Sequence, residues 1–156
     1  MKKTLKIIFP IFLLALFFGN GNAQSYDSKL SLIMYDSFPG YPSTTPYADS
    51  YAGRYRIEVP GTNMRIRITH NIPSTLSDGA GHTIPFSIAN NNAAYKIGGS
   101  LNSNNATTFN PNSTIVVDLQ GNTRITVWLG GTVSPPTNAF PSNNYSGTIT
   151  ITTVIL

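Results

Sequence analysis

Residues 143–156 read NNYSGTITITTVIL, a run in which isoleucine and threonine alternate almost to the carboxyl end of the chain. Successive side chains of an extended strand point to opposite faces, so alternation with period two is typical of a strand with one buried face. Ile149, Ile151 and Ile155 share one face with Thr153, and the threonines between them take the other. The sequence therefore predicts a strand over residues 145–155 whose isoleucines enter a core.

The same period recurs along the chain, and clusters of Pro, Gly and Asn separate the apolar segments. Strands are expected over residues 29–35, 54–59, 63–69, 83–89, 93–97, 114–119, 123–129 and 145–155. The stretches 38–51 and 134–144 are rich in Pro, Ser and Asn and are expected to be loops. This pattern predicts an all-β fold, an antiparallel β-sandwich of about seven or eight strands.

Two hairpins are expected within this set of strands. Val59-Pro60-Gly61-Thr62 has Pro and Gly where a type II turn requires them, and Gln120-Gly121-Asn122 separates two strongly alternating runs. Each hairpin pairs the strands that flank it. Trp128 lies on the face opposite Ile125 and Val127, and the pattern does not decide whether it is buried or displayed.

The amino-terminal residues resemble a secretory signal. Lys2, Lys3 and Lys6 precede an apolar stretch over 7–18, and small or polar residues follow as far as Ala23. The apolar stretch is shorter than the roughly 20 residues of a membrane span, so no transmembrane segment is expected in the mature protein. We expect residues 1–23 to be a signal peptide and residues 24–156 to form a single domain that is secreted through a periplasm.

Charge and cysteine content narrow the function classes. Three of the ten Lys and Arg residues lie in the expected signal, which leaves seven against six Asp and Glu. A balance so close to neutral does not favour an acidic partner, and a nucleic-acid partner is not expected. The chain has no cysteine, which excludes disulfides and thiol chemistry.

Catalytic constellations are not apparent in the sequence. The imidazoles are His70 and His82, the carboxylates are scattered, and no nucleophile motif occurs. The stretch Asp78-Gly79-Ala80-Gly81-His82 is more typical of a glycine-rich turn than of a metal loop. We therefore expect a protein that is not an enzyme and that uses no metal or cofactor.

Four arginines offer one candidate ligand surface. Arg54 and Arg56 share one face of a strand, and Arg65 and Arg67 share one face of its expected hairpin partner. Such a patch would suit an anionic polysaccharide or a nucleic acid, because guanidinium groups match carboxylate and phosphate oxygens, and Tyr47 is a further candidate of this ligand surface. The alternative is that the arginines form an ordinary solvated face that deters edge association.

The second half of the chain resembles known secreted bacterial domains. The stretch TRITVWLGGTVSPPTNAFPSNNYSGTITITTVIL, with Gly130, Gly131, Thr132, Tyr145 and Gly147, resembles the closing part of the family called domain of unknown function 4402. It is also similar to the end of spore coat protein U, a relative of secreted pilus subunits, and GHTIPFSI over 81–88 is similar to a middle strand of that type. The chain differs from pilus subunits in lacking a cysteine pair and in having Ile155 at the penultimate position.

This resemblance implies an immunoglobulin-like sandwich that is exported and assembles by strand donation, in which an extended segment of one subunit completes the sheet of another. Leu30, Leu32 and Met34 alternate near the expected mature amino terminus and form a candidate donor. In the last strand, Ile149, Ile151 and Ile155 are further candidate assembly residues. The alternative is that they belong to the domain's own first strand. The expected function is a structural subunit of a bacterial surface fibre, coat or adhesive layer, pilus-like, whose partners are itself or other surface subunits. The alternative function is a monomeric module that binds carbohydrate or another surface.

Overall fold

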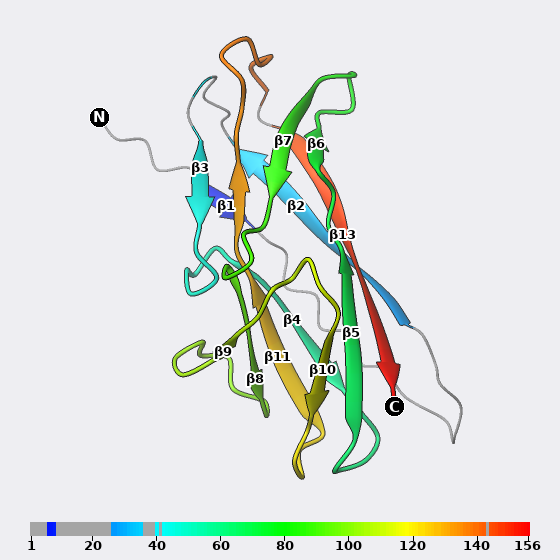
Figure 1. Cartoon of the computed structure of the whole chain (residues 1–156). Coiled ribbons are helices and arrows are strands. Elements are labelled where there is room, and N and C mark those ends of the chain that lie inside the picture. The colour runs from blue at the N-terminus through cyan, green and yellow to red at the C-terminus, as the bar shows by residue number, and fades with distance from the viewer. Residues whose placement is uncertain (1–5, 9–25, 36–39, 41, 143) are drawn as a thin grey trace.

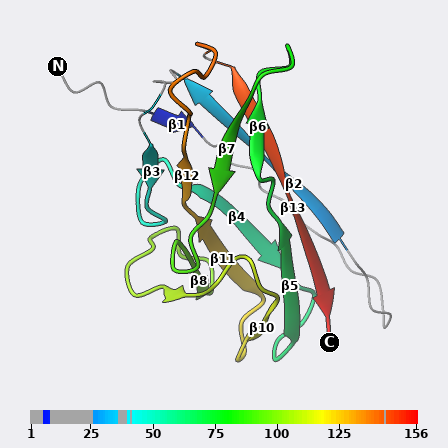
Figure 2. The ribbon, with the colours of Figure 1, turned by 45° about the horizontal axis from the view of Figure 1, so that its top comes forward.

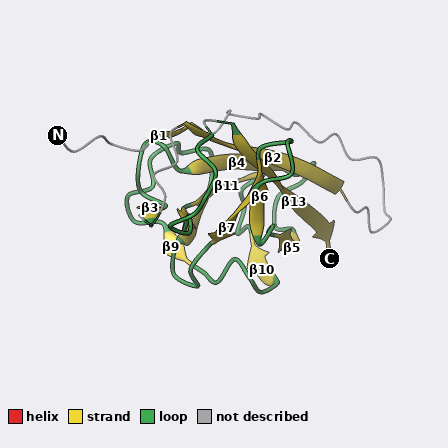
Figure 3. Ribbon diagram, turned by 90° about the horizontal axis from the view of Figure 1, so that it is seen from above, coloured by secondary structure: helices red, strands yellow, loops and turns green. Residues whose placement is uncertain are grey.

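The computed structural model describes residues 6–8, 26–35, 40, 42–142 and 144–156, with 6–8 and 26–35 described by their backbone. Every regular element in these residues is a strand, and the strands form two antiparallel sheets packed on each other (Figure 1). Figure 3, viewed from above, shows strands and connecting loops. The all-β sandwich predicted from the alternation is confirmed. The expected cleavage position after Ala23 lies outside the described residues.

The larger sheet has nine strands, in the order β1-β2-β13-β6-β7-β12-β3, with β5 pairing β13 and β10 pairing β5. The smaller sheet has the order β4-β11-β8-β9. The bounds in the larger sheet are β1 Lys6–Ile8, β2 Tyr26–Tyr35, β3 Ser43–Thr45, β5 Arg65–Asn71, β6 Thr75–Ser77, β7 Thr83–Ser87, β10 Ile115–Asp118, β12 Gly131–Val133 and β13 Tyr145–Ile155. Those in the smaller sheet are β4 Gly53–Glu58, β8 Ala93–Ile97, β9 Thr107–Thr108 and β11 Arg124–Leu129.

One core fills the space between the sheets. Alternate residues of β5 and β13 in the larger sheet, and of β4 and β11 in the smaller, bury their side chains in it. Ile66, Ile125, Val127 and Ile149 have no exposed surface. Burying an aliphatic side chain contributes about 1.5–3 kcal/mol each, so this shared core holds the two sheets together.

All eight expected strands are present, and their ends differ from the expected ones by three residues at most. The described chain has thirteen strands rather than seven or eight. The five strands that were not expected have only two or three residues each; they are β1, β3, β6, β9 and β12. β3 lies in the expected loop 38–51, and β1 lies in the expected signal peptide. Strands this short contain no measurable alternation, so the sequence pattern does not reveal them.

Both expected hairpins are wrong. β4 pairs β11 in the smaller sheet and β5 pairs β10 and β13 in the larger sheet, so the chain crosses the core between β4 and β5. The same crossing occurs between β10 and β11. The two crossings lie side by side, because the Val59 amide donates to the Thr123 carbonyl at 2.8 Å and the Leu119 amide donates to the Met64 carbonyl at 2.9 Å. Positive φ falls at Asn63 (60°), and Gly61 is not among the positive-φ residues, which excludes the expected type II turn.

The chain also changes sheets at Gly130, between β11 and β12. Figure 1 shows β12 directly above β11. A Cβ at Gly130 would collide with the Asn92 side chain and with the Thr45 carbonyl. Asn92 fixes this corner, because its Nδ2 donates to the Thr45 carbonyl at 3.0 Å and its Oδ1 accepts from the Tyr47 amide at 2.8 Å.

Candidate functional site

The seam between β2 and β13 is the longest strand pairing in the described chain. Nine consecutive residue pairs join the strands, from Tyr145 opposite Met34 to Thr153 opposite Tyr26. Figure 2 shows β2 running beside β13 along the flank of the sandwich. The candidate donor segment predicted from the sequence is therefore a strand, and in this structure it pairs with the chain's own β13.

The register of this seam aligns the apolar positions of both strands. Residues directly opposite each other in an antiparallel pair lie on the same face of the sheet. Leu30 is opposite Ile149 and Leu32 is opposite Gly147. Ile149 is completely buried in the core. The positions Leu30, Leu32 and Met34 therefore lie on the core face of the larger sheet.

The other edge of β13 is also paired. Residues 150–155 pair with β5, and Ser146 pairs with Ser77 in β6. Of the β13 residues expected to serve assembly, Ile149 and Ile151 are buried and Ile155, opposite Ile66, is half-buried. β13 is thus an interior strand of its sheet. Without β2, the edge of β13 that pairs with β2 would be open.

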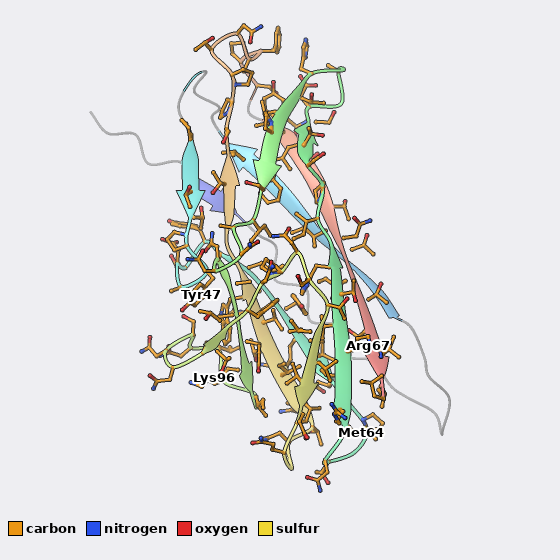
Figure 4. All side chains as sticks on the ribbon, in the orientation of Figure 1. Tyr47, Met64, Arg67 and Lys96 are labelled. Carbon is orange, nitrogen blue, oxygen red and sulfur yellow. The ribbon has the colours of Figure 1, made fainter. Side chains whose placement is uncertain are left out.

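The four arginines do not form one patch. β4 and β5 lie in different sheets, so Arg54 and Arg56 are on the outer face of the smaller sheet and the exposed Arg65 and Arg67 are on the outer face of the larger. Figure 4 shows Arg67 on the side of the molecule away from Tyr47. The expected patch required a hairpin that does not form. Glu58 pairs with a fifth arginine across the smaller sheet, Arg124, at 2.9 Å.

Cations of the smaller sheet hold the loop of residues 98–106 over its outer face. Arg54 Nη1 donates to the Leu101 carbonyl at 3.3 Å, and Arg56 Nη2 donates to the Gly99 carbonyl at 3.1 Å. Lys96 Nζ donates to the Asn104 carbonyl at 2.8 Å. Two of the arginines expected to bind ligand therefore fix the position of a loop.

Between this loop and residues 46–52 lies a pocket of about 700 Å³. Trp128 of β11 and Arg54 of β4 line it from the sheet, residues 48–50 and 52 line one side, and residues 100–103 line the other. Trp128 is 4% exposed, so this tryptophan is covered rather than displayed. Tyr47 is half-buried and is not among the lining residues.

Sequence reasoning missed most of this pocket. The one signal in the sequence was a lone tryptophan on the polar face of an alternating strand, which indicates that another segment of the chain covers that face. Asp49 and Leu101 carried no signal, because they lie in loops whose path depends on the arginine contacts.

The stretch from Asp78 to His82 is a turn, as expected. Asp78 Oδ1 accepts from the amides of Ala80 and His82 at 2.9 and 3.1 Å, and Oδ2 contacts His82 Nδ1 at 2.6 Å. Burial alone would raise the pKa of Asp78, but these hydrogen bonds lower it below its ordinary value. The His82 ring stacks on Phe140 with ring centroids 4.0 Å apart. Across the described residues, no group of three or more His, Cys, Asp and Glu side chains gathers as metal ligands would.

His70 lies in the core rather than at a surface site. Its Nε2 is 2.6 Å from the Tyr55 hydroxyl, and its ring stacks on Phe109 with centroids 5.6 Å apart. Burial lowers the pKa of His70 to about 4 and raises that of Tyr55. Since the histidine is neutral at pH 7 and enclosed, it contributes to packing.

Comparisons of the chain with protein-family models, with curated proteins and with solved structures found no match. In the ranges that the structure describes, no helix has the length and apolarity needed to cross a membrane.

Proposed function

We propose that this protein is an exported, non-enzymatic structural subunit of a bacterial surface fibre, coat or adhesive layer, and that copies associate by exchanging strand β2. The observation that carries the proposal is the nine-pair seam between β2 and β13. Within the described residues, β2 pairs with β13 and β1 only. The rest of the sandwich is thus linked to β2 through one edge of one strand.

Exchange preserves every interaction of the seam. A β2 strand from a second copy would make the same backbone hydrogen bonds to β13 and place the same apolar positions on the core face. Seven residues, 36–42, connect β2 to β3, and they include Pro39 and Pro42. Seven extended residues reach at most about 25 Å, which limits how far an exchanged β2 can lie from β3 of its own copy.

The expected signal peptide bears on both export and assembly. β1 lies inside the expected signal peptide, so cleavage after Ala23 would remove it and leave the outer edge of β2 without its partner. An open strand edge is a template for pairing with another chain. The resemblance to domain of unknown function 4402 and to spore coat protein U supports the same role.

Engineered cysteines distinguish exchange from pairing within one chain. The chain has no cysteine, and Ser31 lies directly opposite the exposed Thr148. Directly opposite Cα atoms lie about 4.5–5.5 Å apart, within the range that a disulfide spans. We expect Ser31→Cys and Thr148→Cys proteins, unfolded together and refolded as a mixture, to form a disulfide-linked dimer on a non-reducing gel.

The matched control replaces Thr148→Cys by Thr152→Cys. Thr152 is opposite Asp27, four residues out of register with Ser31, and the control mixture should give no dimer. If the mixture gives no dimer and the double variant Ser31→Cys/Thr148→Cys gives only a cross-linked monomer at every concentration, β2 stays in its own subunit and the proposal is wrong.

A further inference from the structure

Hydrogen bonds support both walls of the pocket over Trp128. Arg54 and Arg56 hold the loop of residues 98–106 through the Leu101 and Gly99 carbonyls. On the opposite side, Asp49 Oδ1 accepts from the Tyr51 amide at 2.8 Å, and the Ala52 amide donates to the Asp49 carbonyl at 3.1 Å. Hydrogen bonds to the sheet and within the turn thus define both walls without a ligand. Figure 4 shows Tyr47 and Lys96 on the same side of the molecule, near these two walls.

The lining combines apolar and hydrogen-bonding groups. Most of the apolar surface comes from Leu101, which is 55% exposed at the rim, while Trp128 lies beneath the pocket and is 4% exposed. Four residues with hydrogen-bonding side chains also line the pocket: Ser50, Ser100, Asn102 and Ser103. Asp49 and Arg54 add one negative and one positive charge.

This chemistry selects among ligand classes. An anionic ligand would meet Asp49, a cationic ligand would meet Arg54, and a purely apolar ligand would displace water from both charged groups without offering them a hydrogen bond. A sugar has C–H faces that pack on apolar side chains and hydroxyls that both donate and accept. The volume lies within the roughly 300–1,000 Å³ of small-molecule sites. We infer that this pocket binds a short neutral oligosaccharide.

The inference is independent of strand exchange, because the pocket lies on the smaller sheet and β2 belongs to the larger. Trp128 is the only tryptophan and it lines the pocket, so a change in the surroundings of the pocket should change the tryptophan emission. The test titrates the purified protein with cellotetraose, maltotetraose and chitotetraose, and with tetragalacturonate as an anionic probe. We expect a saturable change in Trp128 emission with at least one neutral tetrasaccharide and none with tetragalacturonate.

Two variants test the location. Asp49→Asn keeps an oxygen that accepts from the Tyr51 amide but removes the charge, and it should weaken binding about tenfold or more. Ala48→Phe places a ring in the pocket from an exposed rim position and should abolish binding. Asp118→Asn, at an exposed carboxylate on the larger sheet, is the matched control and should bind as the unmodified protein does.

Three results would overturn the inference. The first is that no neutral tetrasaccharide changes the emission. The second is that Asp49→Asn and Ala48→Phe both keep full affinity, which would place the sugar elsewhere. The third is that tetragalacturonate binds more tightly than every neutral probe, which would make this an anion site.

Discussion

His70 is a titratable residue enclosed by the core, and it couples the stability of the fold to pH. Its pKa of about 4 lies below the ordinary 6.5 because burial disfavours the charged ring. Its Nδ1 atom is buried and has no hydrogen-bond partner among the described residues. Protonation would therefore add a charge that the surroundings do not stabilise.

The sign of the pH dependence follows from the direction of this shift. As pH falls below about 6.5 the unfolded chain takes up a proton that the folded chain refuses, so stability is complete above 6.5 and declines towards pH 4. At about 1.4 kcal/mol per pKa unit the loss is about 3 kcal/mol. Urea unfolding at several pH values should show it, and NMR should follow the His70 ring directly.

The control for this dependence is Tyr55→Phe/His70→Phe, which removes both partners of the buried hydrogen bond together. Between pH 6.5 and 4 its free energy of unfolding should fall by about 3 kcal/mol less than that of the unmodified protein, and the decline that remains belongs to carboxylates such as Asp78, whose pKa lies below its ordinary value. An equally steep decline in the double variant would assign the dependence to other groups.

Gly130 is the second residue on which the fold depends. Gly130→Ala would place a methyl group against Asn92 and the Thr45 carbonyl, and we expect a loss of about 2–4 kcal/mol in the free energy of unfolding. Gly99→Ala is the control, because a Cβ there makes only ordinary contacts with Arg124. Thermal unfolding of both variants measures the difference, and equal melting temperatures would contradict this explanation of Gly130.

At the scale of the element, the sequence predicted which segments are strands but not how they pair. Period-two alternation identifies an extended segment with one buried face, and it does so for β4 and β5 alike. It contains no information on whether two such segments share a sheet or face each other across a core, since both arrangements bury the same residues. The prediction of a single arginine surface was wrong for this reason. The prediction of strand β13 was correct because it needed only the alternation within that segment.

The β2 strand supplies the prediction that belongs to this scale. Leu32→Asp would place a carboxylate on the core face opposite Gly147, where a charge costs several kcal/mol, whereas Ser31→Asp alters the other face. In light scattering of residues 24–156 over a concentration series, we expect the mass to rise for the unmodified protein and for Ser31→Asp, but not for Leu32→Asp. A monomer at every concentration in all three would contradict strand exchange.

At the scale of the whole molecule, the two proposals use different parts of the sandwich. The seam lies in the larger sheet, and the pocket opens over the smaller one. Subunits joined through β2 would therefore leave the pocket accessible on every copy. An array of weak sites on one polymer binds a repetitive surface far more tightly than a single site does.

The two crossings between the sheets determine how such a chain reaches its native state. β4 does not pair with β5, and β10 does not pair with β11, so neither pair forms a local hairpin. Each of these four strands pairs instead with strands that are distant in sequence. Chains dominated by non-local contacts fold in milliseconds to seconds rather than microseconds. If copies exchange β2 as proposed, this is the interval in which β13 would pair with whichever β2 arrives first, and the local concentration of newly made chains would decide whether a monomer or an assembly is formed.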